Sequence, residues 1–264
     1  MPYAENSGVK IYWEEHGEGD PLLLIMGLGY TLEMWHRTAP ILKQQYRTIL
    51  FDNRGVGRSD VPVGAYSISA MAADAAAVLD SAGIVRAHVF GISMGGMIAQ
   101  EFALQYPRRV RSLILGCTSH GGPEAVLADA EVLKTVAERA MMSPEDGIRA
   151  MVSFIYDSGT PRERIEEDLA IRRHTYPSIQ GYLGQLQAIF AYESRTRLAQ
   201  LKAPTLVLHG ESDRLVPPEN GRRVARLING ARLEIFAGAS HIFPTDQPEK
   251  THQTILEFLA DQSG

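Results

Sequence analysis

The chain has 264 residues, of which 45% are hydrophobic and 22% are charged, and its formal net charge is −5. This size and composition fit one large α/β domain with room for an inserted subdomain. The negative charge disfavours nucleic acid and anionic membranes as partners, and no apolar run approaches the roughly 20 residues that a membrane-spanning helix needs.

The first residues and the cysteine content bear on location. Residues 1–6 lack the basic stretch and following apolar stretch typical of a signal peptide. Cys117 is the single cysteine, so an internal disulfide is excluded, and its apolar neighbours favour a buried, unreactive thiol. We therefore expect a cytoplasmic protein.

Short runs rich in Leu, Ile and Val predict strands, and helix-period runs lie between them. The first strand alternates apolar with polar residues, as at a sheet edge. Most of the others are nearly continuous runs of apolar residues, as in strands buried on both faces. This alternation predicts a mostly parallel sheet with helices on both faces. The predicted strands are Val9–Glu15, Leu22–Met26, Thr48–Phe51, His88–Gly91, Ser112–Gly116, Thr205–His209 and Leu233–Phe236, and the predicted helices are Ser69–Ala82, Gly95–Tyr106, Pro218–Ile228 and Pro248–Leu259.

The segment from Pro123 to about Gln200 interrupts the alternation, because it contains no convincing strand. We interpret residues 1–122 and 201–264 as the core of one domain and residues 123–200 as a helical insertion that lies over one end of the sheet. The helices predicted in the insertion are Ala125–Met141, Pro144–Tyr156, Arg162–Arg173 and Ile179–Arg195.

A serine stands between glycines where a predicted strand meets a predicted helix. The segment Gly91-Ile92-Ser93-Met94-Gly95 has the spacing G-x-S-x-G, which in this context indicates a sharp turn that exposes a nucleophilic hydroxyl. The neighbouring chain leaves no room for side chains at the two glycines. The hydroxyl would project at the carboxyl edge of the sheet, beside a helix N-terminus that favours developing negative charge.

Serine is a weak nucleophile without a base, and the base needs an acid to orient it. Asp213 follows the strand Thr205–His209, with Glu211 as the competing acid in the same loop. His241 follows the strand Leu233–Phe236. Both loops lie at the carboxyl edge of the sheet, so Ser93, Asp213 and His241 are the predicted catalytic triad.

Acyl transfer also requires N–H donors for a developing oxyanion. The residue after the serine supplies one, the amide of Met94. The glycine-rich loop after the strand Leu22–Met26 supplies the other, most simply the amide of Leu28. The spacing of the histidines and the cysteine matches no metal-site pattern, so we expect neither a metal nor a cofactor.

Several segments of the chain resemble the α/β-hydrolase superfamily. They occur in the same order as in that superfamily, and the resemblance covers nearly the full length of the chain. The closest resemblance is to small capped carboxylesterases and 3-oxoadipate enol-lactonases. It implies a mostly parallel eight-stranded sheet flanked by helices, with a helical cap inserted after the sixth strand. Many members have His-Gly in the oxyanion loop, where this chain has Met26-Gly27. The segments are "DNRGVGRS", "GISMGG", "GESDRLVP" and "GASHIFPTDQPE".

The side chains expected around Ser93 are mainly apolar, and one insertion helix is rich in arginine. The interleaved glutamates in that helix favour a solvated face; the alternative is an inward arginine that binds a substrate carboxylate. The expected pocket residues are Met26, Trp35, His120, Phe154 and Phe190, and the arginines are Arg162, Arg164, Arg172 and Arg173.

The sequence therefore predicts a serine hydrolase that cleaves small carboxylic esters or lactones through an acyl-enzyme. Alternatives on the same triad are a lyase, a perhydrolase or a carbon–carbon bond hydrolase, because a superfamily does not fix a reaction. A ligand receptor without turnover is the least favoured alternative. We expect a small-molecule ester or lactone as partner, no nucleic acid, no membrane, and a monomer or small homo-oligomer.

Overall fold

Eight strands form one sheet in the computed structural model, which describes residues 2–262 apart from the side chain of Ala140. Its strand order is β1-β2-β4-β3-β5-β6-β7-β8. The pairings β1–β2 and β2–β4 are antiparallel and the others are parallel, which confirms the predicted sheet. The strands are β1 (Tyr3–Asn6), β2 (Val9–His16), β3 (Asp20–Ile25), β4 (Tyr46–Phe51), β5 (Ala87–Ile92), β6 (Val110–Gly116), β7 (Thr205–Gly210) and β8 (Arg232–Phe236).

The strand β1 is the one that the residue pattern did not reveal. Its four residues, Tyr-Ala-Glu-Asn, form a hairpin with β2 through Ser7 and Gly8, whose φ angles of 52° and 79° suit a tight turn. Only Ala4 of the strand is buried. Such a short, largely exposed strand has too few apolar residues to be recognised by alternation.

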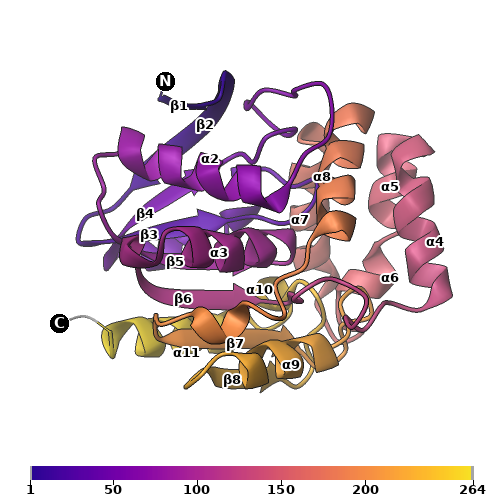
Figure 1. Ribbon diagram of the computed structural model, residues 1–264. Coiled ribbons are helices and arrows are strands. Elements are labelled where there is room, and N and C mark those ends of the chain that lie inside the picture. Colours follow the sequence, from indigo (N-terminus) through magenta and orange to yellow (C-terminus); the bar gives the residue numbers. More distant parts are fainter. Residues whose placement is uncertain (1, 263–264) are drawn as a thin grey trace.

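Helices cover both faces of the sheet, as Figure 1 shows. Alternate residues of a central strand supply the two layers, because successive side chains point to opposite faces. Leu23 and Ile25 belong to the core under α2, α3 and α9, whereas Leu22 and Leu24 belong to the core under α1 and α11. These helices are α1 (Ala39–Leu42), α2 (Ile68–Ser81), α3 (Met94–Gln105), α9 (Glu219–Leu227) and α11 (Pro248–Ala260); the short α10 (Phe243–Asp246) precedes α11.

The chain between β6 and β7 is helical, and Figure 1 shows its helices grouped beside the end of the sheet toward which β6 points. The first two predicted helices there are each divided, and the last, predicted to reach Arg195, ends at Ala191. Asp129 caps the first α-helix through the amide of Val132, so that helix begins five residues later than predicted. The helices are α4 (Ala130–Glu138), η3 (Arg139–Met141), α5 (Pro144–Arg149), α6 (Val152–Ile155), α7 (Arg162–His174) and α8 (Ile179–Ala191). Within residues 2–262, no helix has both the length and the apolar character needed to cross a membrane.

Candidate active site

Ser93 occupies a strained position between β5 and α3. Its φ of 58° and ψ of −121° lie in a region that residues with a side chain rarely adopt. A Cβ atom at Gly91 would lie 2.1 Å from the Gly95 carbonyl oxygen, and one at Gly95 would lie 2.1 Å from the Ile25 carbonyl oxygen. The two glycines are therefore required for the turn that presents Ser93.

His241 and Asp213 meet as expected, from separate loops after β8 and β7. The Nδ1 atom of His241 lies 2.8 Å from Oδ2 of Asp213, and both side chains are buried. This contact leaves the other ring nitrogen, Nε2, as the one available to a substrate or to a hydroxyl. Glu211, the competing acid in the loop, is exposed and has no such contact among the described residues.

The Asp213 carboxylate is held on several sides. Its Oδ1 accepts hydrogen bonds from the amides of Leu215 (2.9 Å) and Val216 (2.8 Å). The Nε2 atom of the buried His209 lies 3.3 Å from Oδ2. Burial alone would raise the pKa of Asp213, but the charge of His241 and the hydrogen bonds from His209 and His241 outweigh burial and hold the pKa well below its usual range.

The Ser93 hydroxyl and the His241 ring line the same small cavity, of about 60 Å³. Among the hydrogen bonds of the described side chains, His241 is joined to Asp213 but not to Ser93. Gly27 is also part of this wall, and a Cβ atom there would lie 3.1 Å from the Cβ of Ser93. The loop after β3 thus approaches the serine closely because residue 27 has no side chain.

The two predicted oxyanion donors are the amides of Leu28, in the loop after β3, and of Met94. Met94 is the first residue of α3, and neither amide donates to an acceptor within the described part of the chain. The next amide of the loop, that of Gly29, donates to Oε1 of Gln185 on α8 (2.8 Å), and Nε2 of Gln185 donates to the Arg54 carbonyl oxygen (2.8 Å). Gln185 is fully buried and holds the loop from the insertion side, a role that the sequence did not reveal.

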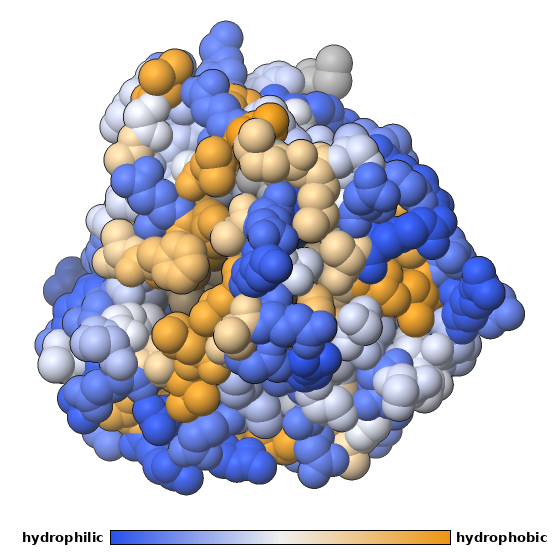
Figure 2. All heavy atoms as spheres, turned by 90° about the vertical axis from the view of Figure 1, so that its right-hand side faces the viewer, coloured by the Kyte–Doolittle hydropathy of each residue, from blue (hydrophilic) through white to orange (hydrophobic). Residues whose placement is uncertain are grey.

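A second cavity, of about 150 Å³, also opens onto Ser93. Leu28 and Met94 line it together with apolar residues of the insertion, among them Leu127 and Phe190. These two are 64% and 66% exposed, so they stand where the cavity meets solvent. Figure 2 shows apolar side chains gathered around a hollow on this side of the molecule.

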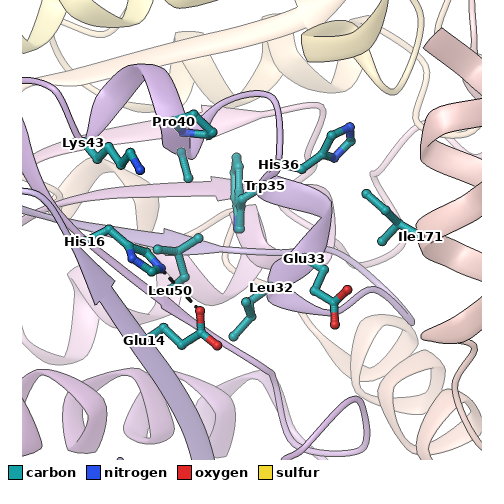
Figure 3. Close-up of a pocket in the computed structure, with 11 residues that line it drawn as sticks. Glu14, His16, Leu32, Glu33, Trp35, His36, Pro40, Lys43, Leu50 and Ile171 are labelled. Atoms are coloured by element: carbon teal, nitrogen blue, oxygen red, sulfur yellow. Dashed lines mark hydrogen bonds and ion pairs between the residues drawn. The ribbon is translucent and has the colours of Figure 1, made fainter. Parts of the chain in front are cut away.

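Of the five expected pocket residues, Met26 and Phe190 line the cavities that contain Ser93. The other three line neither of these cavities. Trp35 packs on Phe90, with ring centroids 5.1 Å apart, and faces a wide surface cavity beside Glu33 and His36 (Figure 3). It also lines a small cavity together with His241 and Met26, so it lies near the predicted base although Ser93 lines neither of its two cavities.

His120 and Phe154 are the remaining two. His120 is buried, with Nδ1 2.7 Å from the Gly121 carbonyl oxygen, and lines a different cavity. Phe154 packs within the insertion, and the Arg214 guanidinium lies 4.8 Å from its ring centroid. His120 lies in the loop after β6 and Phe154 lies in α6. In both segments the direction of a side chain depends on tertiary packing, which the position in the chain does not reveal.

The arginines of α7 do not all lie on a solvated face. Arg162 is exposed and Arg173 pairs with Glu145 at 2.9 Å, in line with the favoured expectation. Arg172, however, is only 2% exposed and points inward, where its guanidinium lies 4.9 Å from the Tyr30 ring centroid. The alternation of arginine and glutamate along α7 does not distinguish this one position.

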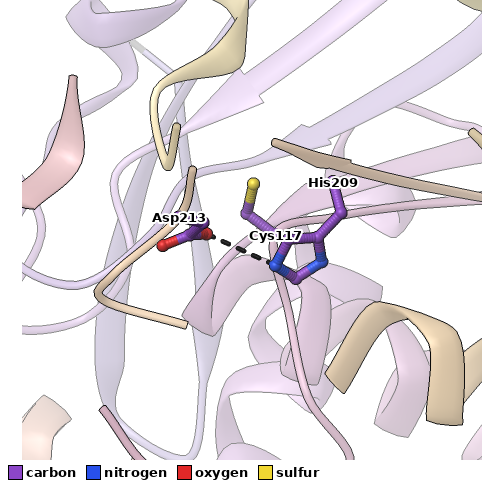
Figure 4. Close-up of side chains that lie close together, drawn as sticks. All are labelled: Cys117, His209 and Asp213. Carbon is purple, nitrogen blue, oxygen red and sulfur yellow. Dashed lines mark ion pairs between the residues drawn. The ribbon is translucent and has the colours of Figure 1, made fainter. Parts of the chain in front are cut away.

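Cys117, His209 and Asp213 place their ligand atoms within 4.8 Å of one another (Figure 4). Burial first, and then the charge of Asp213, raises the pKa of the Cys117 thiol well above its usual value. A metal ion binds the thiolate, so this environment opposes ligation. Because Asp213 is already bonded to His241, we assign no metal to the cluster.

The model of the α/β-hydrolase fold family matches residues 20–156 and 171–248. The chain belongs to the α/β-hydrolase fold family. A carbamate hydrolase by name, RutD of Azorhizobium caulinodans, is 34% identical over 99% of both chains. The 2-hydroxy-6-oxononadienedioate/2-hydroxy-6-oxononatrienedioate hydrolase of Burkholderia vietnamiensis is 32% identical, over 97% of this α/β hydrolase and 92% of the relative.

Solved structures agree with this assignment. The enol-lactonase of Burkholderia xenovorans superposes with a TM-score of 0.88 at 26% identity, covering 98% of this chain and all of its own. The names of these relatives support hydrolase activity for the α/β hydrolase described here, whereas they differ in the bond that is cleaved.

Proposed function

We propose that this α/β hydrolase cleaves small carboxylic esters or lactones through an acyl-enzyme formed on Ser93. The observation that carries the proposal is the 2.8 Å contact of His241 with Asp213, in a cavity wall that also contains the strained Ser93. A buried carboxylate that fixes one imidazole nitrogen leaves the other to act as a base.

In the proposed reaction, Nε2 of His241 accepts the hydroxyl proton of Ser93 as Oγ attacks the carbonyl carbon. The amides of Leu28 and Met94 donate to the resulting oxyanion. When the tetrahedral intermediate collapses, the imidazolium returns the proton to the leaving alkoxide. A water molecule, deprotonated by His241, then attacks the acyl-enzyme and releases the acid.

The helices between β6 and β7 supply much of the walls of both cavities beside Ser93, where the substrate would bind. We infer that residues 123–200 act as a cap. Its apolar residues would desolvate the substrate, and its Gln185 holds the loop that carries the Leu28 amide.

Burst kinetics with an activated aryl ester test the proposal. We expect a rapid release of one phenolate per active site, followed by slower turnover, and loss of both phases in Ser93→Ala. Unchanged turnover in Ser93→Ala would overturn the assignment of the nucleophile.

Hydrolysis of a carbon–carbon bond on the same residues is the second candidate. It is favoured by the dienedioate hydrolase of Burkholderia vietnamiensis, which is 32% identical over 97% of this chain. If ring-cleavage dienoates are turned over with a far higher kcat/KM than esters or lactones, this candidate replaces the first.

A further inference from the structure

Arg139 is a buried cation without a counterion. It lies in η3, directly after α4, and is 5% exposed. Its Nε has no acceptor, and no carboxylate of the described residues forms an ion pair with its guanidinium. Its neighbours are aromatic: the rings of Tyr176 and Tyr182 lie 5.5 and 5.2 Å from the guanidinium carbon.

Other arginines of the insertion do have carboxylate partners. Arg149 and Arg173 both contact Glu145, at 2.6 and 2.9 Å, and Arg195 contacts Glu124 at 2.9 Å. All of these pairs are at the surface, where an unpaired charge would be tolerated by water. Burying a charge without a partner costs on the order of several kcal/mol, so the buried, unpaired position of Arg139 requires an explanation.

The explanation lies in where Arg139 points. It lines the small cavity that also contains Ser93 and His241, and it is the one side chain of that wall with a permanent charge. Tyr30 stands in the same wall, and the guanidinium of Arg172 lies against its ring. All three guanidinium nitrogens of Arg172 are buried without acceptors, but Arg172 itself does not line the cavity, so Arg139 is its one cationic wall residue.

The larger cavity on the other side of Ser93 has the opposite character. Its lining consists of apolar residues with a few neutral polar ones, and none of them is charged. Leu28 and Ser93 line both cavities, so the proposed nucleophile and one proposed oxyanion donor stand where the two meet. A molecule that reacts at Ser93 would therefore extend into a cationic space on one side and an apolar space on the other.

We propose that Arg139 binds a carboxylate of the substrate, which makes the substrate an anionic ester or lactone with an apolar remainder in the larger cavity. This inference rests on the proposed function and names its substrate class. The planar guanidinium matches a carboxylate with two parallel N–H donors. Arg172 contacts the cavity wall only through the Tyr30 ring, so it is not part of the proposed carboxylate site.

A matched pair of esters tests the proposal: benzyl hydrogen succinate, and benzyl 4-oxopentanoate, in which a methyl ketone replaces the carboxylate. Affinity is measured by calorimetry with Ser93→Ala protein, so the result does not depend on turnover. We expect the anionic compound to bind about tenfold more tightly or better, in keeping with a charged hydrogen bond. Adding Arg139→Gln removes that preference and leaves the binding of the neutral compound unchanged.

The control is Arg162→Gln, which removes the same charge from an exposed position in the same segment. We expect it to retain the preference, and Arg139→Lys to retain part of it. Equal affinity for the two compounds, or a preference that survives Arg139→Gln, overturns the inference. Hydrolysis of the neutral ester that depends on Ser93 but shows no anion preference would overturn this inference alone and leave the proposed function standing.

Misfolding of Arg139→Gln is detected separately by thermal unfolding. Because the native charge has no partner, we expect the variant to melt at the same temperature as the parent protein or above it. A lower melting temperature together with weaker binding of both compounds would show that Arg139 stabilises the fold instead, and would contradict the assignment.

Discussion

Arg54 and Arg139 are both buried arginines, but only Arg54 has a carboxylate partner among the described residues. Arg54, in the loop after β4, donates to both carboxylate oxygens of Asp74 on α2, at 2.6 and 2.7 Å. Arg139, in the insertion, has no carboxylate partner among the described residues. The charge of Arg54 is therefore matched within the chain, whereas the charge of Arg139, at the cavity wall, is available to a ligand.

Asp213 and His241 are also a matched pair, and we expect that breaking it reduces activity more than any other change described below. Asp213→Asn keeps the shape but lets the imidazole adopt the wrong tautomer, so kcat for an aryl ester falls by about 10⁴-fold. Steady-state kinetics measure this loss. Glu211→Gln, in the same loop, is the control and leaves kcat unchanged; a large loss there would instead identify Glu211 as the acid.

Substituting leucine for each arginine in turn compares the two sites directly. Arg54→Leu leaves Asp74 buried without its partner, so the free energy of unfolding falls by about 3–5 kcal/mol. Arg139→Leu leaves no carboxylate without a partner, so we expect no decrease in the free energy of unfolding. Urea denaturation measures both values. Equal losses in the two variants would mean that both arginines serve the fold.

Gln185 is the next test, because it connects the insertion to the loop of the Leu28 amide. Gln185→Leu leaves the Gly29 amide without its acceptor, a loss of about 1–3 kcal/mol that we expect in kcat rather than in KM. Gln187→Leu, exposed on the same helix, is the matched control. If kcat is unaffected by Gln185→Leu, the loop holds its shape without the insertion.

The residues that sequence could place are those whose roles follow from strand order. Ser93, Asp213 and His241 each lie in the turn or loop after a predicted strand, and parallel strands bring their carboxyl ends to one edge. The glycines at 91 and 95 follow from the same turn. These local rules also predict the sheet, apart from β1, which is too short and polar to show a pattern.

The residues that sequence could not place depend on how helices pack against one another. Arg172 and Arg173 are neighbours in α7, yet one is buried and the other pairs with Glu145 at the surface. Arg139 falls within a predicted continuous helix, and the structure instead begins a 3₁₀ turn there. A side chain's direction at such a break follows from tertiary contacts, which no periodicity encodes.

Two buried carboxylates, Asp246 and Asp213, also differ in whether a cation pairs with them, and we expect this difference to have a small effect on stability. Asp246 accepts from Thr160 Oγ1 (2.5 Å) and the Ser240 amide (2.7 Å), and no cation pairs with it among residues 2–262. Burial therefore raises the pKa of Asp246 from 3.8 to about 6. Asp213, which faces His241, has a lowered pKa.

These opposite shifts predict opposite dependences of stability on pH. Folded Asp246 holds its proton more firmly than the unfolded chain does, so its contribution to stability falls as pH rises from about 4 to 6. The contribution of Asp213 is present above its ordinary pKa and is lost on acidification below it. Urea denaturation of wild type and Asp246→Asn across pH 4–7 isolates the first effect; parallel curves would contradict the raised pKa.

Covalent labelling shows directly whether Ser93 is an activated nucleophile. The protein is treated with a fluorophosphonate, which phosphonylates a serine activated by a neighbouring base, and the modified peptide is identified by mass spectrometry. We expect one label on Ser93, absent from Ser93→Ala and strongly slowed in Asp213→Asn. Labelling at another residue, or a Ser93 that stays unmodified in folded protein, would contradict it.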